Sequence, residues 1–187
     1  NVVAFSTNAN LGTLREIPGV ARTLAMQTQP SATAMAGVAF AQQPLLQVRD
    51  QFGNLRTNDS STVVTAARNA GSGVLQGTTN RTALNGMVSF TNLAHNVATN
   101  ITITFSASGL TNTNSLLIAV SPAAADRLVF ITQPGTATYG SLLSSQPVLK
   151  SRDAFGNDSA VGLGASRFVS LNLSAGSGSL VGSSSLD

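Results

Sequence analysis

The sequence contains one twelve-residue phrase twice. Residues 43–54 read QPLLQVRDQFGN and residues 146–157 read QPVLKSRDAFGN, an offset of 103 residues (146 − 43). Two further landmarks recur in the same order: Thr28–Pro30 returns as Thr132–Pro134, and Ala70–Gly73 returns as Ala175–Gly178. Landmarks in constant order indicate a duplication, and a period of about 100 residues is typical of tandem independent domains rather than of a solenoid repeat.

Around the first copy of the phrase, apolar residues alternate with polar ones. Leu46 and Val48 alternate with Gln47 and Arg49. Similar short apolar stretches, bounded by Gly, Asn, Ser or Thr, occupy residues 24–26, 63–64, 74–75, 87–90, 101–105 and 116–120. A period of two, in about seven strands over about 100 residues with no room for a helix, predicts an all-β fold of tandem β-sandwiches.

The phrase itself predicts a strand followed by a tight turn. The aspartate accepts backbone N–H groups, while glycine and asparagine tolerate positive φ at the far end of the turn. We expect both phenylalanines to cap one end of their own sandwich core, and both arginines to lie across the same sheet. The repeated structural turn comprises Arg49, Asp50, Phe52, Gly53 and Asn54, and Arg152, Asp153, Phe155, Gly156 and Asn157.

The turn also offers oxygen atoms to a cation. The weak calcium candidates are Asp50, Asn54, Asp153 and Asn157. Calcium takes 6–8 oxygen ligands, however, and the loose spacing with few carboxylates favours turn capping. We therefore expect no metal site and no cofactor.

The composition limits the chemistry that this chain can perform. Charged residues make up only 9% of it, and it has no cysteine, one histidine, one glutamate (Glu16) and one lysine (Lys150). Thiolate chemistry is excluded, and few groups suit acid–base work, so we expect no catalytic residues and no enzyme activity. The single histidine, His95, is expected in a loop. The net charge of +3 is scattered, which argues against nucleic-acid binding, and no apolar run reaches the ~20 residues of a membrane span.

The combined pattern resembles a known family. The order Q-P-x-x-x-x-R-D-x-F-G-N, then A-G-S-G-x-L, then N-G-x-V-x-F is similar to the tandem Ig-like modules of large bacterial surface proteins, including the invasin/intimin type. The resemblance covers residues 22–187. It implies Ig-like sandwiches that act as spacers or fibre units in cell adhesion, secreted to the extracellular side of a bacterial cell surface.

The repeat divides the chain into three parts. Residues 1–21 form an N-terminal strand segment, either a donor strand or the tail of a preceding domain. Residues 22–121 form Ig-like domain 1, here called the first unit. Residues 122–187 form Ig-like domain 2, the second unit, which lacks counterparts of about three C-terminal strands. An open sandwich exposes apolar surface and strand edges, which favours pairing with another strand.

One source of the missing strands is the N-terminal segment of another copy. Asn1–Phe5 resembles Asn85–Phe90, a strand whose counterpart the second unit lacks. Strand addition from one copy to the next, as in donor-strand complementation of a pilus or fimbria, would generate a head-to-tail filament. The candidate assembly residues are Val2, Val3, Phe5 and Leu11. The alternative is that the chain is a window of a longer array, whose next residues complete the domain.

The sequence therefore predicts a structural subunit or repeat segment of a bacterial extracellular filament or adhesin. Its expected partners are copies of itself or adjacent repeats, head to tail, while a host or cell-surface ligand stays open. The alternative is a ligand-binding or carbohydrate-binding Ig-like module attached to a larger secreted protein. Sugar stacking normally uses exposed Trp or Tyr, and this chain has no Trp and a single tyrosine, Tyr139.

Overall fold

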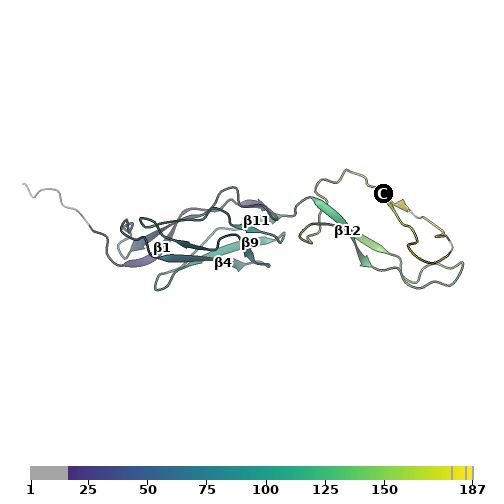
Figure 1. Cartoon of the computed structure of the whole chain (residues 1–187), viewed down its shortest axis with the longest axis horizontal. Helices are drawn as coiled ribbons and strands as arrows, with labels where there is room; N and C mark the ends of the chain where they lie inside the picture. Colours follow the sequence, from purple (N-terminus) through teal and green to yellow (C-terminus); the bar gives the residue numbers. More distant parts are fainter. Residues whose placement is uncertain (1–16, 178, 184, 187) are drawn as a thin grey trace, which may run out of the picture.

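The computed structural model describes residues 17–186, except residues 178 and 184. All regular elements in these residues are β-strands, so the predicted all-β fold is confirmed. The two units lie end to end (Figure 1). In the described part of the chain there is no helix of the length and apolarity that crossing a membrane requires.

The first unit is a sandwich of two sheets. One sheet contains three antiparallel strands in the order β1 (Ala21–Thr28), β3 (Leu45–Asp50) and β7 (Met87–Ser89). The other runs in the order β2 (Thr33–Met35), β11 (Ile118–Ser121), β9 (Asn100–Ser106), β4 (Val63–Ala70) and β6 (Asn80–Thr82), with β10 (Thr113–Asn114) also paired to β9. The short strands β5 (Leu75–Gln76) and β8 (Ala94–His95) pair with each other.

The core of the first unit follows the predicted alternation. In β3, Leu46 and Val48 are fully buried, whereas their neighbours along the strand are partly exposed. Strand β9 alternates in the same way, and the ring of Phe105 packs against Phe90 with 5.4 Å between ring centroids. Burying each such side chain contributes about 1.5–3 kcal/mol, so the core residues supplied by both sheets favour their packing together.

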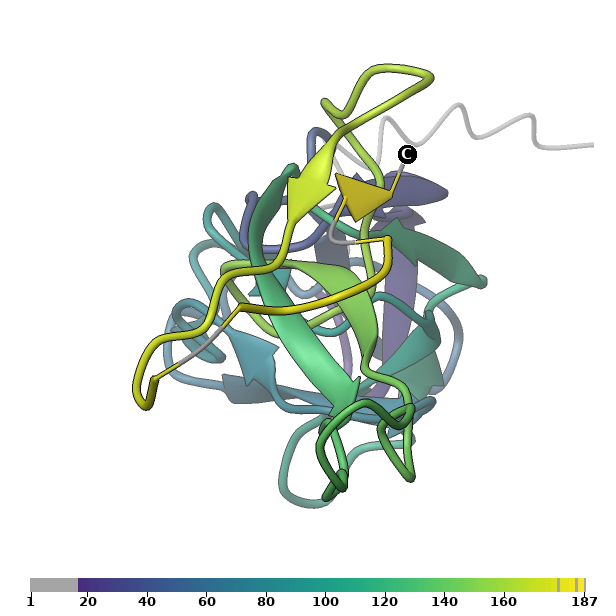
Figure 2. The same ribbon diagram turned by 90° about the vertical axis from the view of Figure 1, so that its right-hand side faces the viewer.

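The second unit repeats the first strand pair of the first unit. Strands β12 (Ala125–Thr132) and β13 (Val148–Asp153) pair antiparallel in the register of β1 and β3, with irregularities at the corresponding two places. A second small pair follows, β14 (Val169–Ser170) with β15 (Ser185–Leu186). Figure 2 looks along the chain from this end and shows long loops joining these strands. Among the described residues, the second unit thus keeps the first strand pair but, apart from it, has only the two-stranded sheet of β14 and β15.

Burial separates the two units sharply. Leu24 of β1 is 5% exposed, whereas its counterpart Leu128 of β12 is 49% exposed. Among the described residues of the second unit, none of the hydrophobic side chains is buried; the only buried residues are Asp153 and Ser159. Equivalent sequence and equivalent strand pairing therefore give a closed core in one unit and an open face in the other.

The duplication supplies a matched pair of core substitutions. We expect Leu46→Ala to cost about 2–5 kcal/mol, because it leaves a cavity in a closed core. Its counterpart Leu149→Ala should cost under about 1 kcal/mol, because Leu149 is only partly buried and water fills the space. Urea unfolding of the full chain, followed by circular dichroism, measures both. Equal costs would contradict the difference in core closure.

Candidate functional site: the repeated turn and the open face of the second unit

The aspartate of the repeated turn in the first unit accepts hydrogen bonds with both carboxylate oxygens. Asp50 Oδ1 accepts from the backbone N–H groups of Phe52 and Asn54, each at 2.9 Å. Asp50 Oδ2 accepts from the Asn54 side-chain amide at 3.1 Å and from the backbone N–H of Gly19 at 2.8 Å. Gly53 takes the expected positive φ of 86°. The carboxylate therefore closes the turn and also holds the segment that leads into β1.

The second unit reproduces this arrangement. Asp153 accepts from the backbone of Phe155 and Asn157, each at 2.9 Å, and from the Asn157 side chain at 2.8 Å. Its remaining bond, at 2.9 Å, comes from the backbone N–H of Ala123 in the linker between the units. The linker is short, because β11 ends at Ser121 and β12 begins at Ala125.

The linker carbonyl is held at the same place in both units. Arg56 donates to the Gly19 carbonyl at 2.7 Å. Ser159, its counterpart, donates to the Ala123 carbonyl at 2.5 Å. Sequence reasoning missed this anchoring role. The available signal was a repeated proline, since Pro18 and Pro122 precede the two held linker residues at the offset of the repeat.

The environment of the two turn aspartates favours the ionised carboxylate. Burial by itself raises the pKa of Asp50, but the N–H donors from Gly19, Asn54 and Phe52 outweigh it and hold the pKa below its ordinary value. Burial likewise raises the pKa of Asp153, and the donors from Asn157, Ala123 and Phe155 lower it below the ordinary value. Because N–H donors already occupy these oxygens, the geometry favours turn capping over calcium binding.

The expected role of the two phenylalanines is wrong. Neither side chain caps the core of its own unit, since Phe52 is 76% exposed and Phe155 is 46% exposed. The ring of Phe155 instead lies over Gly37 of the first unit, where a Cβ atom would overlap the ring. Gly37 has a φ of 78°, in the region that glycine adopts without strain. The turn of the second unit thus projects outward, onto its neighbour.

Asn157 completes the joint between the units. Its side-chain amide donates to the Asn96 carbonyl at 2.8 Å, and its oxygen accepts from the Ala98 backbone N–H at 2.8 Å. The same side chain donates to Asp153, so the joint and the turn share one residue. The two units are thereby held at three points: the linker on Asp153, the Phe155 ring on Gly37, and Asn157 on the loop of residues 96–98.

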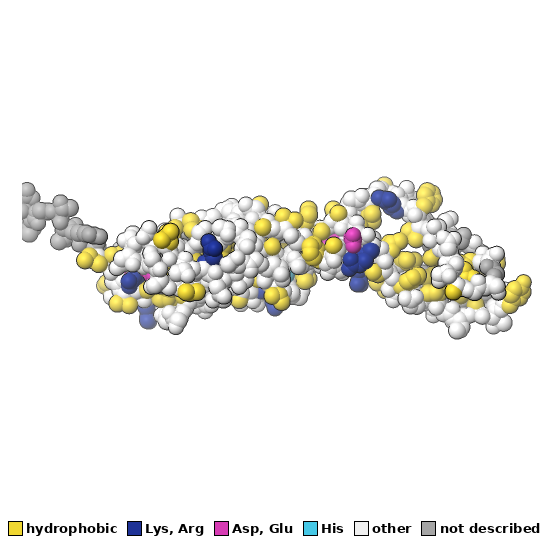
Figure 3. Space-filling view, in the orientation of Figure 1, with side chains coloured by type: hydrophobic (Ala, Val, Ile, Leu, Met, Phe, Trp, Pro, Cys, Tyr) yellow, Lys and Arg dark blue, Asp and Glu magenta, His cyan; other side chains and the backbone are white. Residues whose placement is uncertain are grey.

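The open face of the second unit is the other unusual surface. In the first unit β7 pairs with the outer edge of β3, placing Val88 opposite Leu46. The corresponding edge of β13 has no strand partner among the described residues. Two cavities, of about 580 and 510 Å³, lie over this face and share Pro147 and Leu171 in their lining. Hydrophobic side chains are exposed over the second unit in Figure 3.

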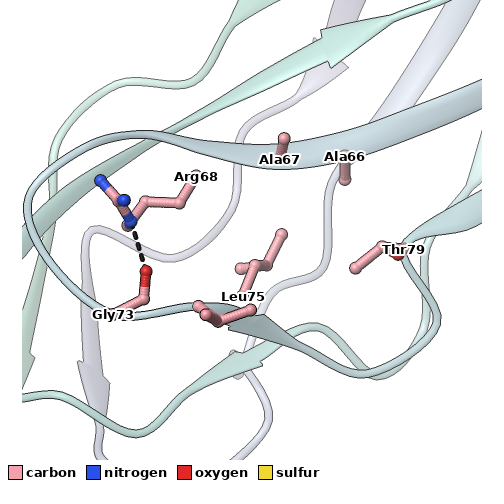
Figure 4. A pocket seen from close by; sticks show the side chains of 7 residues that line it. Ala66, Ala67, Arg68, Gly73, Leu75 and Thr79 are labelled. Carbon is pink, nitrogen blue, oxygen red and sulfur yellow. Dashed lines mark hydrogen bonds between the residues drawn. The ribbon is translucent and has the colours of Figure 1, made fainter.

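A third cavity, in the first unit, lacks groups suited to catalysis. It has a volume of about 330 Å³ and is lined by residues of β4, β5 and the intervening loop, together with Thr79 between β5 and β6. Arg68 is its one ionisable lining residue, and Figure 4 shows the guanidinium donating to the Gly73 carbonyl. A second guanidinium bond, at 2.5 Å, goes to the Gly71 carbonyl. Arg68 therefore fastens the β4–β5 loop.

His95 lies in β8 and is fully buried, so its expected position in a loop is wrong. Its Nε2 lies 2.8 Å from the Ser72 carbonyl oxygen, while Nδ1 has no hydrogen-bond partner in the described structure. No group of three or more His, Cys, Asp or Glu side chains that could hold a metal ion occurs in the described residues. The proposed assembly residues Val2, Val3, Phe5 and Leu11 lie outside the described residues.

Comparisons with known proteins give no family. No protein-family model matches the sequence, and no curated protein matches it. Among solved structures, the chain is similar to a beta-glycosidase from Bacteroides vulgatus, with a TM-score of 0.41 and 14% identity over 55% of this chain. It is also similar to extracellular domains 3–5 of Drosophila OTK, with a TM-score of 0.29 and 12% identity over 65% of this chain. The chain spans 14% and 41% of those two chains, respectively.

Replacing the turn aspartate should make stability depend less on pH. Asp50→Asn should lower the urea midpoint at pH 7, because the amide keeps one neutral acceptor oxygen and replaces the other with an NH2 group, which cannot accept two of the four N–H groups. Since the folded pKa of Asp50 is lowered, its contribution is fully present above about pH 4 and is lost as the pH falls through the folded pKa. Urea midpoints of both proteins should converge on acidification. A difference that stays constant in acid would contradict the carboxylate's role.

Asn157 and Asn54 provide a matched test of the joint. Both variants, Asn157→Ala and Asn54→Ala, lose the side-chain bond to the turn aspartate, but only the first loses the two bonds to the neighbouring unit. We expect Asn157→Ala to loosen the joint, so that ¹⁵N relaxation gives the two units more independent tumbling. Asn54→Ala should leave the tumbling unchanged. If neither variant changes it, the joint does not depend on Asn157.

Proposed function

We propose that the chain is a structural segment of a bacterial extracellular filament or adhesin, and not an enzyme. Its units are joined end to end, and a strand from an adjacent unit pairs with the open strand edge of the second unit. The observation that carries this proposal is the free edge of β13 beside apolar residues that have buried counterparts in the first unit.

The free edge is suited to a strand. Residues Val148, Leu149 and Lys150 correspond to the β3 residues that pair with β7. A strand added there would form main-chain hydrogen bonds along the edge and place alternate side chains over the open face. Leu128 and Phe130, at 49% and 44% exposure, lie on the neighbouring strand β12, on the face that the second sheet covers in the first unit. Strand addition at β13 would therefore remove the unpaired edge, and covering the apolar face would take further strands in the place of that second sheet.

The N-terminal segment has a sequence suited to this edge. Aligned on their phenylalanines, Val3 takes the place of Val88, and Phe5 takes the place of Phe90. Val88 and Phe90 are both buried in the first unit. By the register of β7 on β3, Val3 of the added strand would lie opposite Leu149. Because donor and acceptor surfaces lie on different parts of the chain, such a contact is heterologous and propagates into a filament unless it closes into a ring.

The low content of ionisable groups supports a structural role. A spacer needs packed strands and firm joints, and both are built here from apolar side chains, amides and backbone groups. The ionisable side chains that the structure buries, Asp50, Asp59, His95 and Asp153, are each hydrogen-bonded to their own turn, loop or linker. The extracellular, bacterial setting of the proposal comes from the resemblance to surface-protein modules.

A matched pair of substitutions tests strand addition. Val3→Asp should abolish filaments of the full chain, because it buries an unpaired charge opposite Leu149. Ala4→Asp should leave filaments intact, since Ala4 takes the place of Ser89, which is exposed in the first unit. Electron microscopy of the purified chain, with intact mass on the same sample, gives the readout. Filaments unaffected by Val3→Asp, or a natural subunit far heavier than 19.0 kDa, would contradict completion by another copy of this chain.

A further inference from the structure

The turn of residues 52–54 in the first unit has every feature of the turn that docks in the second unit, but no neighbour in the described structure. Phe52 corresponds to Phe155 and is 76% exposed instead of 46%. Asn54 corresponds to Asn157 and makes the same side-chain bond to its turn aspartate, at 3.1 Å against 2.8 Å. The two contacts that Asn157 makes to the preceding unit have no equivalent for Asn54 among the described residues.

The linker side of this joint is already in place. Gly19 is held by Asp50 in the way that Ala123 is held by Asp153, at 2.8 and 2.9 Å respectively. A proline precedes the held residue in both linkers. The chain therefore enters both units in the same way. In each unit the aromatic turn lies beside the incoming linker.

The glycine turn that receives Phe155 is also repeated. In the first unit this turn and the loop of residues 96–98 are here called the exit end, which adjoins Ser121, whose carbonyl accepts from Ala36 at 2.8 Å. The second unit repeats the glycine turn at Gly140, with a φ of 77° against 78° for Gly37. A Cβ atom on Gly140 would meet nothing within 4 Å, so this glycine is uncovered in the structure.

We propose that the turn of residues 52–54 is a docking surface for the exit end of a complete unit of the same kind, linked in tandem through residues 17–20. Phe52 covers the glycine of that unit, and Asn54 bridges its loop through one backbone carbonyl and one backbone N–H. The turn recognises two features of its occupant. One is a glycine with positive φ, and the other is a loop with an available carbonyl and N–H two residues apart, as at Asn96 and Ala98.

This joint differs from the strand addition of the proposed function. It uses a turn and a loop rather than a strand edge, and it involves residues that the open face of the second unit does not contain. The docking proposal rests on the proposed function in one respect: both assume that units of this kind are arranged in arrays. Because no charged side chain takes part in the contacts of Phe155 and Asn157, docking should be insensitive to salt.

A tandem chain with a tryptophan reporter tests the docking surface. Residues 17–122 are placed ahead of residues 19–187, so that Pro122 of the added unit precedes Gly19 of the original chain. The natural sequence has no tryptophan, so Phe52→Trp in the original part is a unique fluorophore, and acrylamide quenching measures its exposure. We expect the quenching constant to fall, relative to Phe52→Trp without the added unit, by roughly the ratio of the exposures of Phe155 and Phe52.

Two controls make the result specific. Phe155→Trp in the original chain gives the quenching constant of a docked turn. Adding Asn54→Ala to the tandem should return the Phe52→Trp reporter to the undocked value. An unchanged constant in a tandem whose added unit melts cooperatively would overturn the proposal. Protection that rises with protein concentration in the original chain carrying Val3→Asp, which blocks strand addition, would overturn it too, because the occupant would then be a separate molecule. Failure of filament assembly would leave this result unaffected.

Discussion

A buried aspartate that gathers backbone N–H groups is the interaction on which this structure depends. Asp50 and Asp153 each close a turn, fix the end of a strand and hold the linker that enters the unit. Four donors around one carboxylate compensate for its burial, whereas the same carboxylate without them would be costly to desolvate. The position and direction of each unit relative to the incoming chain follow from this one side chain.

The same local structure is present with and without a closed core. Strands β12 and β13 pair in the register of β1 and β3, irregularities included, although only the two-residue strand β14, the counterpart of part of β4, represents the second sheet among the described residues. Hairpin register depends on the turn and on neighbouring residues, whereas core closure in the first unit depends on β4, β6, β9 and β11, which begin between 13 (63 − 50) and 68 (118 − 50) residues after β3 ends. The described residues of the second unit meet the local requirement for strand pairing but not the long-range requirement for core closure, and this leaves the face open.

Much of this architecture could be predicted from sequence, because both of its signals are local. Alternation at Leu46 and Val48 predicts β3, and the Asp-x-Phe-Gly-Asn order predicts the turn. Strands of two or three residues, such as β5, β8 and β10, were harder to delimit, since their pairing is set by tertiary contacts. The phenylalanines were assigned to the wrong surface for a related reason: periodicity separates the inside of a unit from its outside, but does not show what packs on the outside.

The joint explains how a chain with few charges can hold two domains in line. A proline in a linker limits one torsion, which leaves considerable freedom to the residues around it. Here the linker is tied by hydrogen bonds at both the N–H and the carbonyl of Ala123, while Phe155 and Asn157 bind the neighbouring unit from the same turn. Because turn, linker and joint share Asp153 and Asn157, bending at the joint would disturb the turn itself. The hydrogen bonds that close the Asp153 turn therefore also stiffen the joint between the units.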